Sequence, residues 1–340
     1  MIKVLMGLGY YEIGGFKTVI DNLGKYLPRY GVEVTVAARV VRVEPPNHVN
    51  LIKLTPEEFL REARHFDVIH IHTSYPYTKA AVEEGLKNIV FTWHGYTPSI
   101  YVPGLKNKII NFLLKHSYRT LLPRIKYVTA VSQYAAKQLR DFYRLHRVSV
   151  IPNGIDSDIF KPCRRCKASD KLVFLNVTAW NRLKGSDLLI KYFKVIRRKF
   201  PNAILITRRL DRRYHLEGVI AMSEVSYSEM PNLYCSSDIY LLTSRWESFG
   251  LPIIEAFATG TPVIALDRDD ARREHIINSG AGALFRDAES LLRAIDEVLR
   301  DWQEYSRRGI NYAQRFSCDF MARGYVGLYR EVLNGEDIKR

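Results

Sequence analysis

Two glutamates on either side of a predicted helix start are the most informative chemical feature of the chain. Glu247 and Glu255 stand eight residues apart in RWESFGLPIIEAFATGTPVIAL (245–266), with Phe-Gly-Leu-Pro between them. Pro252 suits the first turn of a helix, where a missing N–H costs nothing. The amides just before it then lie at a helix N-terminus, which attracts anions such as a diphosphate. Glu247 and Glu255 would accept hydrogen bonds from sugar and ribose hydroxyls on either side of that anion.

A structural explanation fits the same pattern. One glutamate could be a solvated loop residue, and the other could be favoured at a helix start by the helix dipole. Periodicity alone leaves the two explanations equal. If the functional one holds, the ligand also meets the loop between the glutamates, which is Ser248, Phe249, Gly250 and Leu251.

The elements around this segment follow the rhythm of parallel sheets, in which short apolar runs alternate with helix-length segments. The predicted strands are 2–8, 32–38, 67–72, 88–94, 127–132 and 147–153, then 171–178, 203–207, 218–222, 238–243 and 262–266. The predicted helices are 16–30, 56–64, 77–86, 105–122, 133–143, 185–199, 228–236, 252–259, 272–278, 287–302 and 304–334. The rhythm stops and restarts around 154–170, a charged segment that we interpret as a linker.

The sequence therefore predicts an α/β protein of two Rossmann-like, doubly wound parallel-sheet domains that face each other across a cleft. We expect the first domain at 1–156 and the second at 157–312. The last helix, within 313–340, is expected to cross back to the first domain. In such sheets ligands bind beyond the carboxyl ends of the strands.

The pair Glu-x7-Glu followed by Gly-Thr-Pro-Val-Ile-Ala resembles the nucleotide-sugar site of GT-B glycosyltransferases, specifically the large retaining family 4. Other segments resemble that family in order along nearly the whole chain. These are Gly14-Gly15, Asp67-Val-Ile-His70-Ile-His72, Val131-Ser132, Pro152-Asn153-Gly154-Ile155-Asp156 and Lys184-Gly185.

The resemblance implies the role of each matching residue. His94, at the end of a predicted strand, would lie at the reacting sugar, orient it and stabilise developing charge. Lys184 would act as a point charge on the donor diphosphate, and Glu247 would hold the sugar, so these three are the expected catalytic residues. Gly14 and Gly15 allow close approach of a phosphate or sugar to the backbone. His70 and His72 alternate with isoleucine, so we expect one of them to face the core.

Two segments depart from the family pattern. The family places an arginine shortly before Lys-Gly, but Ala179-Trp180 stand there, and Arg182 is the nearest candidate to replace it. The family's glycine loop after the next strand is replaced by arginine-rich sequence, 208–213, which we expect near phosphate or base. These departures bear on donor preference more than on reaction type. GDP-mannose and UDP-glucose are the expected donors, and a glycan, glycolipid or other hydroxyl is the expected acceptor.

The resemblance also implies that no cofactor is permanently bound and that no metal is required. Asp267-Arg-Asp269 fits the letters of a metal-binding Asp-x-Asp motif but follows the wrong element. Cys163 and Cys166 form a Cys-x-x-Cys, the spacing of half a zinc site or of a short disulfide. No second pair stands at finger spacing, so we interpret them as a linker thiol pair without a catalytic role.

A formal net charge of +15 over 340 residues implies an acidic partner. Nucleic acid is one alternative, but no RNP, KH or helix-turn-helix signature accompanies the charge. A sugar-nucleotide epimerase of the same architecture is another. Residues 104–126 predict a basic amphipathic helix, which either lies on an anionic membrane or packs on the sheet. No apolar run is long enough to span a membrane. We expect a cytoplasmic protein that can also bind peripherally to the inner face of the membrane.

Overall fold

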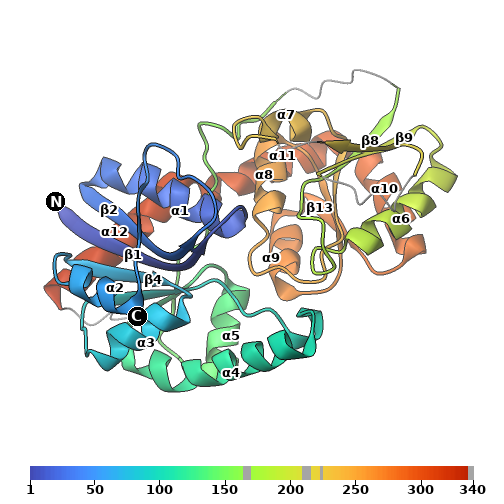
Figure 1. The fold of residues 1–340 in the computed structure, drawn as a ribbon. Coiled ribbons are helices and arrows are strands. Elements are labelled where there is room, and N and C mark those ends of the chain that lie inside the picture. The colour runs from blue at the N-terminus through green and yellow to red at the C-terminus, as the bar shows by residue number, and fades with distance from the viewer. Residues whose placement is uncertain (164–169, 209–215, 223–224, 336–340) are drawn as a thin grey trace. The chain divides into compact units, whose positions relative to one another are not determined.

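The computed structural model describes residues 1–163, 170–208, 216–222 and 225–335 of the chain. They form two compact units, drawn in Figure 1. The first comprises Met1–Gly154 with Cys318–Arg340, and the second comprises Ile155–Ser317. Each unit is built around one parallel β-sheet, as the alternation of apolar runs and helices predicted.

The first unit contains a seven-stranded sheet in the order β3-β2-β1-β4-β5-β6-β7. Its strands are β1 (Ile2–Tyr11), β2 (Val32–Val41), β3 (Asn50–Lys53), β4 (Val68–His72), β5 (Ile89–Trp93), β6 (Tyr127–Ala130) and β7 (Ser149–Val150). Its α-helices are α1 (Gly15–Tyr26), α2 (Pro56–Ala63), α3 (Tyr75–Glu83), α4 (Leu105–Leu121), α5 (Gln133–Tyr143) and α12 (Cys318–Asn334). Short 3₁₀ helices occupy Leu27–Tyr30, Ser99–Tyr101 and Leu122–Arg124.

The second unit contains a six-stranded sheet in the order β10-β9-β8-β11-β12-β13. Its strands are β8 (Leu172–Asn176), β9 (Ala203–Arg208), β10 (Val219–Met222), β11 (Ile239–Leu242), β12 (Val263–Leu266) and β13 (Gly282–Phe285). Its helices are α6 (Ser186–Lys199), α7 (Met230–Cys235), α8 (Leu251–Thr259), α9 (Asp270–Ser279), α10 (Ala288–Arg300) and α11 (Trp302–Ala313), followed by a 3₁₀ turn at Gln314–Phe316.

Side-chain caps and left-handed glycines set several helix boundaries. Thr55 precedes Pro56 and forms a capping box with Glu58, so α2 begins where the chain offers both a cap and a first-turn proline. Gly260 adopts a left-handed conformation and ends α8, as the Thr-Gly-Thr-Pro segment predicted.

The long last helix of the prediction, 304–334, is interrupted. Helix α11 ends at Ala313, the 3₁₀ turn follows, and α12 starts only at Cys318. The chain leaves the second unit between these two helices, and α12 packs against α1, β4 and β5 of the first unit. A helix that is last in the sequence therefore lies beside elements from the start of the chain (Figure 1).

Both sheets have a point at which the strand order reverses. It lies between β1 and β4 in the first unit and between β8 and β11 in the second. Crevices at the carboxyl ends of strands that meet at such a point are the usual ligand sites of doubly wound folds. Across the described part of the chain, no helix has the length and apolar composition needed to cross a membrane.

Candidate active site

In the first unit, three predicted site residues lie at the carboxyl ends of β1 and β5, which flank β4 in the sheet. Gly14 and Gly15 connect β1 to the start of α1, and His94 directly follows β5. The ring of Phe16, in the first turn of α1, meets the His94 ring edge-on, with 4.6 Å between the ring centroids. The glycine loop and His94 therefore face the same end of the sheet. Phe16 was not singled out from the sequence.

Thr73 fixes the backbone of His94. Its φ of +45° lies in the left-handed region, which β-branched residues rarely adopt. Its hydroxyl donates to the carbonyl of Thr92 at 2.9 Å and accepts the His94 N–H at 3.0 Å. A strained residue persists where its surroundings hold it in place, and such residues cluster at functional sites.

The imidazole of His94 is fixed by His72. Nδ1 of His72 lies 2.9 Å from Nε2 of His94. Nε2 of His72 is buried and has no hydrogen-bond partner among the described residues. A proton there would be an orphaned buried donor, so the contacts favour a proton on Nδ1 of His72 that is donated to His94. His94 then carries its own proton on Nδ1.

Burial keeps all three histidines of this cluster neutral. It lowers the pKa of His94 to about 3 and places the pKa of His72 well below its ordinary value. His70 is fully buried between the hydroxyls of Tyr329 and Thr92, each 2.7 Å from one ring nitrogen. His70 and His72 both face the core, whereas the alternation with isoleucine predicted only one. His94 is the half-buried member of the three.

In the second unit, Lys184 is positioned by the glycine that follows it. Gly185 has a φ of +68°, and a Cβ added to it would lie 2.0 Å from the carbonyl oxygen of Thr243. The hydroxyl of Thr243 in turn donates to the Gly185 carbonyl at 3.1 Å. Only glycine permits this approach, so Lys184 is held against the loop that follows β11.

Lys184 and Glu247, which are far apart in the sequence, form an ion pair. The Lys184 ammonium donates to both carboxylate oxygens of Glu247 at 2.8 Å. The side chain of Glu247 is 7% exposed and that of Lys184 is 27% exposed, so the pair lies at the edge of the solvent. The sequence identified both residues separately but did not predict that they would touch.

Asp269 and Arg272 hold the Glu247 loop, a role that the sequence did not predict for either residue. Asp269 accepts the N–H of Glu247 at 3.1 Å and forms a buried ion pair with Arg272. Arg272 also donates to the carbonyls of Ser244 and Leu266, each at 2.7 Å. Asp267, the other carboxylate of the Asp-x-Asp letters, pairs with Arg273 and Arg286.

The helix start between the two glutamates lies where the sequence predicted it. Gly250 is the left-handed N-cap of α8, Leu251 is its first residue and Pro252 its second. The first-turn amides of a helix lack intrahelical acceptors. Phe249 is buried, and its ring packs against His275 and Phe316, so only its backbone is available for a ligand. Ser248 is half-buried in the loop.

Glu255 lies in the following turn of α8 as a buried carboxyl group. Its side chain accepts a hydrogen bond from the Tyr234 hydroxyl at 2.7 Å. Burial raises the pKa of Glu255 to about 7, although Tyr234 and Arg208 act in the opposite direction. Burial, and then the charges of Glu247 and Glu255, raise the pKa of Tyr240 on β11. Glu247, in the loop after β11, and Glu255, on α8, are therefore both close enough to Tyr240 to act on its hydroxyl.

Two family models match the chain. Glycosyltransferase Family 4 matches residues 13–159, and Glycosyl transferases group 1 matches residues 164–316. Together they cover most of both units. The chain belongs to the group 1, family 4 glycosyltransferases.

Relatives of this glycosyltransferase agree with the assignment. It is 26% identical to a phosphatidyl-myo-inositol mannosyltransferase of Mycobacterium leprae, over 90% of this chain and 85% of the relative. Sucrose-phosphate synthase of Thermosynechococcus elongatus superposes with a TM-score of 0.83 at 19% identity, over 99% of this chain and all of that one. Anabaena Alr3699/HepE, solved with UDP-glucose, superposes with a TM-score of 0.77 at 16% identity, over 99% of this chain and all of that one. The fold is GT-B.

Two of the arginines singled out from the sequence, Arg182 and Arg208, lie in the described part of the second unit. Arg182 is exposed, and its carbonyl accepts a hydrogen bond from Arg245 at 2.7 Å. Arg245 also forms a two-pronged ion pair with Asp187, which joins the Lys184 loop to the loop after β11. Arg208 ends β9 near Glu255, whereas 209–213 of the arginine-rich segment lie outside the described residues.

The cysteine pairing of this glycosyltransferase differs from the sequence prediction. Cys163 forms a disulfide with Cys235, 72 residues away, rather than acting with Cys166 as a linker thiol pair. Cys166 lies outside the described residues. Cys318 is buried and is not part of a disulfide. The short Cys-x-x-Cys spacing suggested Cys166 as the partner of Cys163. Cys235 comes close to Cys163 only in the folded chain, so spacing along the sequence could not indicate it.

Proposed function

We propose that this glycosyltransferase moves a hexose from a nucleoside-diphosphate sugar to a hydroxyl acceptor with retention of anomeric configuration. The observation that carries the proposal is the Lys184–Glu247 pair beside the N-terminus of α8. The Lys184 ammonium, the Glu247 carboxylate and the first amides of α8 then lie around the loop that follows β11. A sugar diphosphate requires these three kinds of group.

Lys184 and the amides at Phe249–Leu251 stabilise the leaving diphosphate in this account. Binding of the donor replaces Glu247 with phosphate as the partner of Lys184. The released carboxylate of Glu247 accepts hydrogen bonds from the transferred sugar, and Glu255 accepts them from the ribose. Arg182 is exposed beside Lys184 in the sequence and supplies further positive charge. The rate gain comes from positioning and electrostatics.

The first unit supplies the acceptor side in this account. Gly14 and Gly15 let the acceptor or the sugar approach the backbone closely. His94 is neutral and acts as a hydrogen-bonding group rather than as a charged acid. Its Nδ1–H orients the reacting sugar, while His72 and Thr73 hold the ring and the backbone in place.

GDP-mannose and UDP-glucose are the donors that we favour. The Mycobacterium leprae relative is named a mannosyltransferase, and the Anabaena structure contains UDP-glucose. A glycan or glycolipid is the acceptor that we favour, because the relative's name specifies a phosphatidylinositol acceptor and this chain carries a net charge of +15.

Binding of nucleoside diphosphates tests the donor site. Calorimetry with GDP, UDP, ADP and dTDP should show one diphosphate with a Kd in the micromolar range. Lys184→Ala and Glu255→Gln should each weaken that binding by about tenfold or more, since each removes a charged hydrogen-bond partner. Glu289→Gln is the matched control, because Glu289 is an exposed residue of α10. Equal affinities in all four proteins would exclude this site.

We further propose that α4 docks on an anionic membrane surface. The predicted apolar face is divided: Leu121 and Leu122 are buried, whereas the other half of the helix exposes its apolar side chains. The exposed ones are Leu105 (75%), Ile109 (51%), Ile110 (44%), Phe112 (63%) and Leu113 (56%). The exposed cations Lys106, Lys108 and Arg119 flank them. Apolar side chains beside lysine and arginine fit the headgroup boundary of an anionic bilayer.

Vesicle flotation tests this docking. The protein should float with phosphatidylglycerol-containing vesicles and not with pure phosphatidylcholine, and salt should weaken the binding. The double variant Phe112→Ser/Leu113→Ser should lower the partition coefficient at least about tenfold, since two apolar side chains no longer leave water. Ile277→Ser, at a 67% exposed position of α9, is the control. Equal flotation of the double variant and the control would contradict the proposal.

A further inference from the structure

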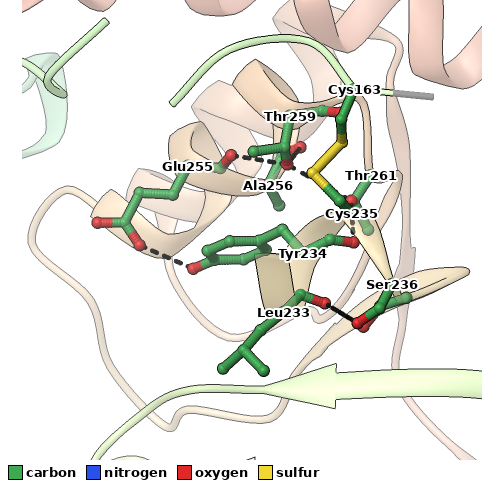
Figure 2. Close-up of a disulfide and its surroundings, with 10 residues drawn as sticks. Cys163, Leu233, Tyr234, Cys235, Ser236, Glu255, Ala256, Thr259 and Thr261 are labelled. Carbon is green, nitrogen blue, oxygen red and sulfur yellow. Dashed lines mark hydrogen bonds between the residues drawn. A yellow bond between two sulfur atoms is a disulfide. The ribbon is translucent and has the colours of Figure 1, made fainter. Parts of the chain in front are cut away.

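The disulfide and the buried carboxyl group of the donor site meet at the end of one short helix. Tyr234 and Cys235 are the last two residues of α7. Cys235 is bonded to Cys163, and the Tyr234 hydroxyl donates to Glu255 on α8 (Figure 2). Neither contact belongs to the donor-binding roles proposed above.

We propose that Tyr234 is a positioning residue for Glu255, and that the Cys163–Cys235 disulfide holds Tyr234 in place, so that reduction of this bond weakens donor binding. The inference rests on the proposed role of Glu255 at the ribose. It adds a redox control of the donor site, with a dithiol as the reductant.

The Tyr234 hydroxyl is well placed to set the orientation of the Glu255 carboxylate. The tyrosine is fully buried and Glu255 is 6% exposed, so water competes little for this hydrogen bond. A buried carboxylate requires hydrogen-bond donors to remain charged. The other ionisable groups that act on this pair are Arg208 on β9, Tyr240 on β11 and Tyr227 in the segment before α7. Tyr240 is itself fully buried.

Helix α7 depends on its neighbours for its position. It has six residues, too few for a helix that is stable without tertiary contacts. Thr261 donates to the Tyr234 carbonyl at 2.8 Å, which holds the main chain of α7 from one side. The N–H of Cys163 donates to the carbonyl of Thr259 at 3.3 Å, at the end of α8. The disulfide therefore joins the end of α7 to a segment already attached to α8.

The reaction is a thiol–disulfide exchange. A dithiol supplies two electrons, the Cys163–Cys235 bond breaks, both sulfurs become thiols, and the dithiol closes to its own disulfide. Disulfides persist in oxidising compartments and are transient in reducing ones. Reduction removes the disulfide that cross-links α7 to the segment at 155–163. The end of α7 can then shift, and the Tyr234 hydroxyl no longer stays on Glu255.

Nucleoside diphosphate affinity before and after treatment with dithiothreitol tests the disulfide. With GDP and UDP as probes, reduction should weaken binding by about tenfold, the value of one hydrogen bond to a charged group. Cys235→Ser should show the weaker affinity with or without the reductant. Cys166→Ser is the control, and it should keep the full response if the bond is Cys163–Cys235. The proposed role of the Cys163–Cys235 disulfide would be wrong if reduction did not weaken diphosphate binding to the wild type, or if Cys166→Ser abolished this effect of reduction.

Tyr234→Phe tests the positioning residue separately. In the wild-type background it should weaken binding about tenfold, and in the Cys235→Ser background it should have little further effect, because the two changes act through one contact. The pH at which binding is half lost should rise in Tyr234→Phe. The hydroxyl stabilises the charged carboxylate of Glu255, so its removal raises the pKa of Glu255, whereas a general loss of packing would leave that pH unchanged.

Two measurements without ligand separate this inference from the proposed function. Mass spectrometry of an unreduced digest should contain the Cys163–Cys235 cross-link. A carbon-13 NMR titration, assigned with Glu255→Gln, should give a higher pKa for Glu255 in Tyr234→Phe than in the wild type. If no diphosphate binds but both ligand-free results hold, the proposed function fails and the Tyr234–Glu255–disulfide arrangement stands. If diphosphate binds and either ligand-free result fails, the inference is wrong and the proposed function stands.

Discussion

Gly185→Ala is expected to destabilise the second unit by about 2–5 kcal/mol. A left-handed backbone costs a residue with a Cβ about 1–2 kcal/mol. The new Cβ would also lie 2.0 Å from the carbonyl oxygen of Thr243, which is backbone at the end of β11 and cannot rotate away. Overpacking of this kind costs about a further 1–3 kcal/mol. Because this turn positions Lys184, nucleotide binding should weaken together with stability.

Urea unfolding of the variant measures the effect. The two units need not unfold in one transition. Nucleotide binding should identify the transition of the second unit by shifting it. Gly185→Ala should move that same transition to a lower urea concentration. Gly327→Ala is the matched control. Gly327 lies inside α12, a Cβ there meets no atom within 4 Å, and alanine is the better helix former, so this variant should be as stable as the wild type or slightly more. Equal unfolding midpoints for Gly185→Ala and the wild type would contradict the role of this turn.

His94→Ala is expected to lower kcat for glycosyl transfer by about 10²–10³. That factor is typical for the removal of one preorganised hydrogen-bond donor at developing charge. The proposed donor residues lie in the second unit, so the affinity for the nucleoside diphosphate should stay within about twofold of the wild type. Since the pKa of His94 is about 3, its ring is neutral at every pH above about 5, and the wild-type rate should show no titration of this residue between pH 5 and 9.

Steady-state and binding measurements on His94→Ala separate the possible results. His146→Ala, at an exposed position, serves as the control and should retain the full rate. An unchanged kcat in His94→Ala would exclude a role for this ring in the reaction. A loss confined to diphosphate affinity would instead place His94 in donor binding.

The sequence predicted most of the fold because buried parallel strands appear as apolar runs. Two strands escaped this criterion. β3 (Asn50–Lys53) and β13 (Gly282–Phe285) have four residues each, lie at sheet edges and are largely exposed or half-buried. An edge strand needs no continuous apolar run, so its pattern resembles a loop. The break at Gln314–Phe316 was also missed, since helical periodicity on both sides hides a short 3₁₀ turn.

For the candidate site, local pattern located residues but not their partners. The positions of Pro252 and Gly260 predicted the start and end of α8, and hence the surroundings of Glu255. The contact of Lys184 with Glu247 spans 63 residues. No spacing along the chain indicates such a contact, because it arises from the adjacency of β8 and β11 in the sheet.

The supporting residues were missed for a related reason. Thr73 and Arg272 belong to common residue types with no unusual spacing, and the Asp-x-Asp letters indicated Asp269 only as a match to a metal motif. Their importance appears only in the left-handed backbone of Thr73 and in the complete burial of Arg272. Tyr234 likewise does not stand out in the sequence, which contains 21 tyrosines. Only the hydrogen bond from its hydroxyl to Glu255 distinguishes it.

Product analysis of the reaction tests the central claim most directly. The wild-type protein should be incubated with GDP-mannose or UDP-glucose and a hydroxyl acceptor, and the products should be analysed by NMR. We predict equal amounts of free nucleoside diphosphate and glycosylated acceptor, with the α configuration of the donor sugar kept in the product. An altered free sugar formed without acceptor would indicate an epimerase, and an inverted linkage would contradict the retaining mechanism. Donor binding without any turnover would contradict the account as a whole.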